Sequence, residues 1–231
     1  FKINELGKII WKKNIYKKAY KKIHKNLVLS VYKDNIYIAD NIGFVYSINL
    51  KDGTLIWIRN YEVPIKSNIK VFDNKIFLIN YDNKIFCLNA MDGSLIWNIF
   101  SVSSFIKSQN LLSIAVTEDE DLIVITSSAD IYKIKANTGQ ILWSRNTADS
   151  LYSDATDFFV SSELVIDKSN VIFSSGYNTF SLNLSNGDTN WKQDVSSVSA
   201  PIVSEKNVFL VNENGYFVIL DRNTGKIISS S

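Results

Sequence analysis

Residues 75–97 read KIFLINYDNKIFCLNAMDGSLIW, and the same pattern recurs along the chain. Copies that align without a gap begin at Asn35, Asp121 and Asn207, and a copy one residue shorter begins at Asn170. Each copy has a glycine four residues before its last position, and that last position is a tryptophan in every copy except the final one, where it is Ser229. A period of roughly 40 to 50 residues is typical of propellers, solenoids and other repeat architectures.

Each repeat has the pattern of short, half-buried β-strands. In the quoted copy, apolar and β-branched residues form three runs, at 76–79, 85–88 and 95–97, and turn residues separate them. A fourth strand is expected in the more variable stretch before each copy, such as residues 66–72 or 200–204. Four antiparallel strands per repeat describe one propeller blade, so we predict an all-β propeller of five full repeats plus a partial one.

The glycine of each repeat predicts a tight hairpin. It follows Asp, Asn or Thr, and such pairs supply the positive φ that the turn requires. The tryptophan four residues later is expected to fill the wedge between neighbouring blades, because one blade cannot bury both of its faces alone. Burial of such a ring contributes about 3 kcal/mol. The predicted structural docking residues are all the tryptophans of the chain: Trp11, Trp57, Trp97, Trp143 and Trp191.

The glycine-centred segments carry a family resemblance. ILDRNTGKII at 219–228, SINLKDGTLIW at 47–57 and KIKANTGQILW at 133–143 resemble the tryptophan-docking repeat of quinoprotein (PQQ-type) propellers. The pair SAPIV at 199–203 and NGYFV at 214–218 is similar to a late blade of the BamB family. The resemblance covers essentially the whole chain. It is specific for the fold and less specific for function.

The BamB resemblance implies a non-enzymatic scaffold of the β-barrel assembly machinery, a lipoprotein at the periplasmic face of the bacterial outer membrane. Its implied partners are the POTRA domains of the barrel assembly protein and unfolded outer-membrane proteins. Propellers of that family close with eight blades, so residues 1–231 are expected to be one domain that is incomplete at both ends. A closed ring of five or six blades is the alternative.

The second function that the resemblance allows is a fragment of a pyrroloquinoline-quinone-dependent dehydrogenase. Such enzymes resemble the repeat and carry a calcium ion, a catalytic aspartate and usually a disulfide between adjacent cysteines. Here Cys87 is the one cysteine and His24 the one histidine. Cys87 alternates with apolar residues and is expected to be a buried, inert thiol. The carboxylates at 118–121 lack calcium-loop spacing. We therefore expect no catalytic residue, no metal and no cofactor.

Residues 144–159 form the longest irregular connection after a tryptophan. Within it, LYSDATD at 151–157 is similar to the Leu-Ser-Asp-x-Asp loop with which BamB proteins hold POTRA domains. The resemblance implies that Tyr152, Asp154 and Asp157 bind the partner. One inserted residue precedes Asp157, so Asp154 matches the family better. The alternative is that these aspartates only cap a turn.

A lysine-rich segment, residues 12–25, stands out in a chain whose net charge is only +2. Its apolar residues Ile15, Ala19 and Ile23, and Tyr16 and Tyr20, recur at helical spacing, which allows a basic amphipathic helix on a membrane surface. The favoured interpretation is a solvated strand end and loop that leads into the next blade. Nucleic-acid binding is not indicated, because arginine is scarce there and the overall charge is nearly balanced.

Overall fold

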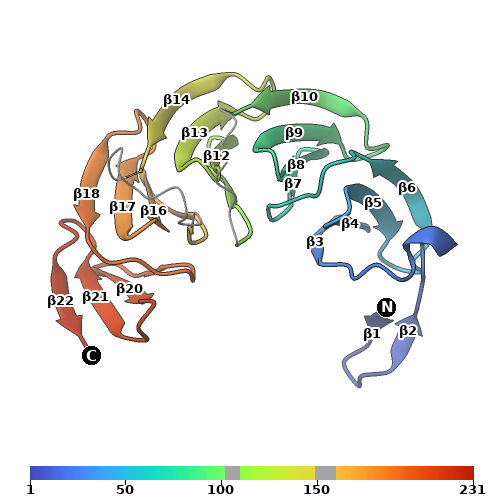
Figure 1. The fold of residues 1–231 in the computed structure, drawn as a ribbon, viewed down its shortest axis with the longest axis horizontal. Coiled ribbons are helices and arrows are strands. Elements are labelled where there is room, and N and C mark those ends of the chain that lie inside the picture. The colour runs from blue at the N-terminus through green and yellow to red at the C-terminus, as the bar shows by residue number, and fades with distance from the viewer. Residues whose placement is uncertain (102–109, 149–159) are drawn as a thin grey trace. The chain divides into compact units, whose positions relative to one another are not determined.

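The computed structural model describes residues 1–101, 110–148 and 160–231. The chain divides into two compact units, Phe1–Ile99 and Phe100–Ser231. Among the described residues, the sheets are one two-stranded hairpin and five four-stranded antiparallel sheets, each formed by strands consecutive in sequence (Figure 1). This is the predicted set of five full repeats and a partial one. No helix in the described part of the chain is long and apolar enough to cross a membrane.

The first unit holds the hairpin and two blades. The hairpin pairs β1 (Lys2–Ile3) with β2 (Ile9–Trp11), and one short 3-10 turn, η1 (Lys18–Tyr20), follows it. The first blade consists of β3 (Leu27–Tyr32), β4 (Asn35–Asp40), β5 (Phe44–Asn49) and β6 (Leu55–Asn60). The second blade consists of β7 (Lys70–Phe72), β8 (Lys75–Ile79), β9 (Lys84–Asn89) and β10 (Leu95–Phe100).

The second unit holds three blades. The third consists of β11 (Ile114–Val116), β12 (Asp121–Ile125), β13 (Asp130–Lys135) and β14 (Ile141–Asn146). The fourth consists of β15 (Val165–Asp167), β16 (Asn170–Ser175), β17 (Asn178–Asn183) and β18 (Thr189–Gln193). The fifth consists of β19 (Ile202–Val203), β20 (Asn207–Val211), β21 (Phe217–Asp221) and β22 (Ile227–Ser230).

The core lies on both faces of the two middle strands of each blade. In β8, the side chains from Ile76 to Ile79 are all fully buried, including those that alternate to opposite faces of the sheet. Within the second unit, one cluster joins Ile123 and Ile131 of the third blade to Phe173 and Phe180 of the fourth. Because full burial of one such side chain contributes about 1.5 to 3 kcal/mol, stacking of neighbouring blades supplies most of the stability.

The glycine turns have the predicted conformation. The φ angles of Gly53, Gly93 and Gly187 are 71°, 71° and 74°. In the first blade, the amide of Gly53 donates to the carbonyl of Asn49 at 2.9 Å, and the ladder shifts register between Ser47 and Ile48. A left-handed glycine followed by a bulge is a common way to close a three- to five-residue hairpin.

One predicted boundary is wrong. The sequence pattern ends the last strand of each blade at its tryptophan and makes residues from Ser144 onward irregular, whereas β14 continues to Asn146. The reason is the partner strand, because Asp130 and Ile131 of β13 still pair with Asn146 and Arg145. The same extension takes β6 to Asn60. Arg59 and Asn60, like Ser144, Arg145 and Asn146, are polar and exposed, so they carry no alternating signal.

Candidate functional site

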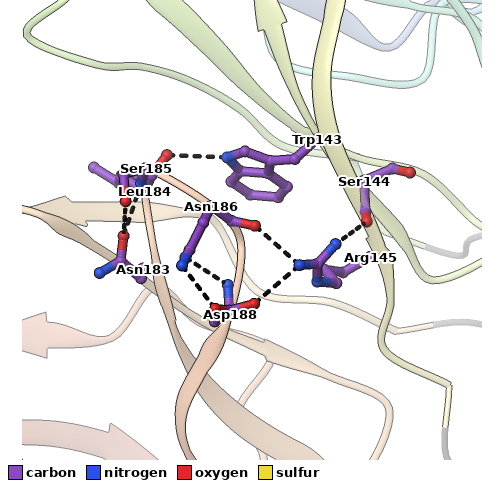
Figure 2. A network of polar contacts seen from close by, with 8 residues as sticks. All are labelled: Trp143, Ser144, Arg145, Asn183, Leu184, Ser185, Asn186 and Asp188. Carbon is purple, nitrogen blue, oxygen red and sulfur yellow. Dashed lines mark hydrogen bonds and ion pairs between the residues drawn. The ribbon is translucent and has the colours of Figure 1, made fainter.

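Figure 2 shows the contact that joins the third and fourth blades. The indole of Trp143 donates from Nε1 to the carbonyl oxygen of Leu184 at 3.0 Å. Its ring lies on the turn of the next repeat, so closely that a Cβ placed on Gly187 would be 2.7 Å from Cε3 of the ring. Only 8% of Trp143 is exposed. The glycine is therefore needed for its conformation and for the space that the ring occupies.

Arg145 extends the same contact. Its guanidinium donates to the carbonyl of Asn186 and to Oδ1 of Asp188, each at 3.0 Å, and to the carbonyl of Ser144 at 2.9 Å (Figure 2). The two charged side chains are exposed by 44% and 66%. An exposed pair of this kind contributes at most about 1 kcal/mol, so the ring and its hydrogen bond carry most of the docking energy.

The docking geometry recurs in the other blades. Trp11, Trp57 and Trp191 donate to the carbonyls of Leu50, Ala90 and Arg222, at 3.3, 3.0 and 2.8 Å. In each case the accepting residue lies three positions before the glycine that the ring covers. Trp57 and Trp191 are buried, and Trp11 and Trp97 are half-buried. The ring of Trp97 lies 6.0 Å from that of Phe77 in its own blade.

Sequence reasoning missed a basic residue in this contact. Lys13, Arg59 and Arg145 each stand two positions after a tryptophan. The aliphatic stems of Lys13 and Arg59 lie against Gly53 and Gly93, and Arg59 Nε donates to the carbonyl of Asp92 at 3.1 Å. The recurrence of a basic residue two positions after a tryptophan is the sequence signal that could have predicted this contact. The stem covers the glycine while the charged head stays in water.

The exposed aspartates beside the glycines are turn residues. Asp52 accepts from the hydroxyl and amide of Thr54, and Asp92 accepts from Ser94 in the same way. The hydroxyl bond from Thr54 lowers the pKa of Asp52 most, and the amide bond from Ser94 lowers the pKa of Asp92 most. These carboxylates therefore stay ionised in the physiological range and stabilise the hairpin.

The remaining polar candidates have ordinary surroundings. Cys87 is fully buried, as predicted, and burial raises the pKa of its thiol to about 12, which disfavours the thiolate. The carboxylates at 118–120 lie on an exposed turn, and Asp121 pairs with Lys133 at 3.3 Å. His24 is exposed. Within residues 1–101, 110–148 and 160–231, no group of three His, Cys, Asp or Glu side chains could hold a metal ion.

The predicted partner-binding residues Tyr152, Asp154 and Asp157 lie outside the described residues, but both flanks of their segment are described. On one side, Asn146 Nδ2 donates to Asp130 Oδ1 at 2.7 Å and to the Ser128 carbonyl at 3.0 Å. The next residue, Thr147, is buried, and its hydroxyl lies 2.7 Å from that of Ser175 at the end of β16.

The other flank reaches the same serine. Ser161 forms an isolated antiparallel bridge with Ser175, and the amide of Gly176 donates to the carbonyl of Val160 at 3.0 Å. Thr147, Ser161 and Ser175 are each exposed by 7% or less. The residues on either side of 149–159 are therefore held together at one buried, hydrogen-bonded point of the fourth blade.

Blades of four antiparallel strands, joined by indole-to-carbonyl contacts over a glycine turn, define a propeller-repeat protein of the quinoprotein type. The family model described as "Outer membrane protein assembly factor BamB" matches residues 2–231. The chain belongs to the BamB family.

Individual relatives are distant. The outer membrane protein assembly factor BamB of Yersinia pestis is 21% identical over 233 residues, which cover 96% of this chain and 58% of that protein. The chain spans between 28% and 58% of the length of the curated relatives that it matches.

Solved structures confirm the propeller fold. The crystal structure of BamB from Moraxella catarrhalis matches with a TM-score of 0.79 at 15% identity, over 89% of this chain and 63% of that one. A europium-containing methanol dehydrogenase matches with a TM-score of 0.71 at 14% identity, over 88% of this chain and 50% of that one. Likenesses at this identity concern the fold, which scaffolds and dehydrogenases share.

Proposed function

We propose that the chain is a non-enzymatic interaction scaffold of the β-barrel assembly machinery, where it aids the folding and insertion of outer-membrane proteins. The observation that carries this proposal is the match of the BamB family model to residues 2–231. Because that match runs through both compact units, we also propose that they belong to one propeller domain. The proposed location is the periplasmic face of the outer membrane, with a lipid anchor as the attachment of the whole protein.

The proposed partners are the POTRA domains of the barrel assembly protein, with unfolded outer-membrane proteins as clients. Binding loops on a rigid scaffold commonly carry such specificity. The anchoring of Thr147 and Ser161 at Ser175 supports a contact made by the residues between them, because a partner could bind there without disturbing the blades. We assign the contact to Tyr152, Asp154 and Asp157.

Asp154→Arg is expected to weaken binding to the POTRA domains by about 2 kcal/mol, a rise in Kd of roughly thirtyfold. The carboxylate is proposed to pair with a basic residue of the partner, so the substitution replaces attraction with repulsion. Tyr152 is proposed to pack beside this pair as an aromatic anchor. Kd is measured by surface plasmon resonance on immobilised POTRA domains, with circular dichroism as the folding check.

The matched control is Glu213→Arg, which makes the same charge change at an exposed position of the fifth blade. Its Kd should stay within about twofold of the unmodified chain. Equal binding by Asp154→Arg and the unmodified chain would remove Asp154 from the interface and leave the scaffold proposal standing. Absence of binding by the whole protein, anchor segment included, would contradict the scaffold proposal itself.

A cofactor titration separates the scaffold from a quinone-dependent dehydrogenase, which shares the fold. We expect no saturable binding of pyrroloquinoline quinone in the presence of calcium at micromolar concentration, followed by absorbance and tryptophan fluorescence. The physical reason is that Cys87 stands alone and buried, so it cannot form a disulfide with an adjacent cysteine against the quinone. Saturable binding together with oxidation of an alcohol would establish the dehydrogenase instead.

A further inference from the structure

Positive charge is concentrated in one short part of the chain. No acidic residue occurs between Glu5 and Asp34, and that stretch contains nine lysines, at 8, 12, 13, 17, 18, 21, 22, 25 and 33. When these nine are subtracted from the 25 basic residues of the chain, 16 basic residues remain against 23 acidic ones. The rest of the chain is therefore acidic, and the modest net charge conceals a strongly basic region.

This region does not form the amphipathic helix that its spacing allowed. Its central part, residues 12–25, is irregular apart from the single 3-10 turn η1, and aromatic residues hold it on the first blade. The hydroxyl of Tyr16 donates to Oδ2 of Asp40 at 2.6 Å, and its ring meets that of Tyr46 edge-on at 6.1 Å. The ring of Tyr20 meets that of Phe44 edge-on at 5.2 Å.

The tyrosine contacts leave the lysines on the outside. Lys17, Lys18, Lys21 and Lys22 are exposed, and among the described residues none of the four forms an ion pair with a carboxylate. Lys25 instead turns inward, with Nζ 4.4 Å from the centre of the Tyr16 ring and a hydrogen bond of 2.7 Å to the carbonyl of Ile23. We call the four exposed residues the lysine surface.

Beside the lysine surface, the apolar side chain of Ile23 is 45% exposed. Exposed ammonium groups and a partly exposed apolar side chain in one segment match the boundary between anionic headgroups and acyl chains in a bilayer. We propose that the lysine surface binds anionic phospholipid headgroups and so holds the first blade against a membrane. This contact is separate from the POTRA-binding contact and does not depend on it.

The composition of the region favours a bilayer over a protein or a nucleic acid. Protein interfaces are enriched in arginine and depleted in lysine, and residues 6–33 contain no arginine. Single-stranded nucleic acids stack on exposed aromatic rings, whereas Tyr16 and Tyr20 are packed against the blade. Lysine is a hydrated point charge that suits diffuse attraction to many headgroups at once.

The test is flotation of the full chain with vesicles of phosphatidylcholine containing 30 mol% phosphatidylglycerol, and with phosphatidylcholine alone, at about 50 mM salt. One variant combines Lys17→Gln, Lys18→Gln, Lys21→Gln and Lys22→Gln. The control combines Lys51→Gln, Lys135→Gln, Lys206→Gln and Lys226→Gln, which removes the same charge from exposed positions of the first, third and fifth blades.

We expect the unmodified chain and the control to bind the anionic vesicles, and the lysine-surface variant to partition at least tenfold less, since each lysine near an anionic bilayer contributes about fivefold. Binding of the unmodified chain should also fall as salt is raised to about 500 mM. Equal partitioning of the two variants would overturn the proposal. Retention of the unmodified chain on immobilised polyglutamate without vesicle binding would assign the surface to an acidic protein and would likewise overturn it.

Discussion

Trp143→Ala is expected to lower the free energy of unfolding of the second unit by about 3 to 5 kcal/mol. The ring is 8% exposed and packs in the cluster that joins the third blade to Val171 and Phe173 of the fourth. Its removal leaves a cavity between the blades and deprives the carbonyl of Leu184 of its donor, which lies at 3.0 Å. Urea unfolding followed by circular dichroism measures the loss.

The chain offers a natural control for this substitution. Ser229 occupies the tryptophan position of the fifth blade and is exposed, so Ser229→Ala should change the free energy of unfolding by less than about 0.5 kcal/mol. Because a repeat array can unfold in parts, the first transition is the one to compare. A loss below about 1 kcal/mol for Trp143→Ala would show that the indole contacts are not what joins the blades.

Much of the fold was predictable because the same combination of a glycine turn and a tryptophan four residues later recurs along the chain. The turn before each tryptophan needs a residue in the left-handed conformation, and the ring of the preceding tryptophan leaves no room for a side chain on that residue. Gly53, in the turn before Trp57, and Gly93, under the ring of Trp57, each meet both requirements. The part of the last strand that follows the tryptophan was not predictable from the alternation of apolar and polar residues. Arg59 and Asn60 are exposed and polar, and only their pairing with β5 keeps them in a strand.

The candidate site was less predictable, since its residues are brought together by contacts across long stretches of sequence. Thr147 and Ser175 lie 28 positions apart, and both are small polar residues of a kind that usually indicates turns. Nothing in the sequence around Thr147 or Ser175 predicts that these side chains are buried. Asp154 is assigned to the partner contact by family resemblance alone, and the binding experiment tests whether it contacts the partner.

The lysine surface shows how one spacing can serve two structures. Tyr16 and Tyr20 are four residues apart, which places them on one face of a helix. The same spacing also lets both rings reach Phe44, at 6.3 and 5.2 Å, across an irregular turn. Packing against the blade decides between the two structures, and that packing depends on residues outside the segment, so the segment's own sequence does not predict it.

Gly187→Ala is expected to destabilise the second unit by about 3 kcal/mol, although it adds one methyl group. The φ angle of Gly187 is 74°, and placing a side chain in this conformation costs about 1 to 2 kcal/mol. The new Cβ would also lie 2.7 Å from Cε3 of Trp143. A buried aromatic ring has no flexible end that could move aside, so the whole ring must shift away from the turn on which it packs.

Gly176→Ala separates these two costs. Gly176 has a φ angle of 57° and no heavy atom within 4 Å of its added Cβ, so only the conformational cost of about 1 to 2 kcal/mol should appear. Thermal and urea unfolding of both variants give the difference. In a Trp143→Ala background, Gly187→Ala should lose its steric part and cost no more than Gly176→Ala, because coupled neighbours are not additive. Additive losses in the double variant would show that the glycine is needed for the turn alone, and that the ring above it imposes no requirement.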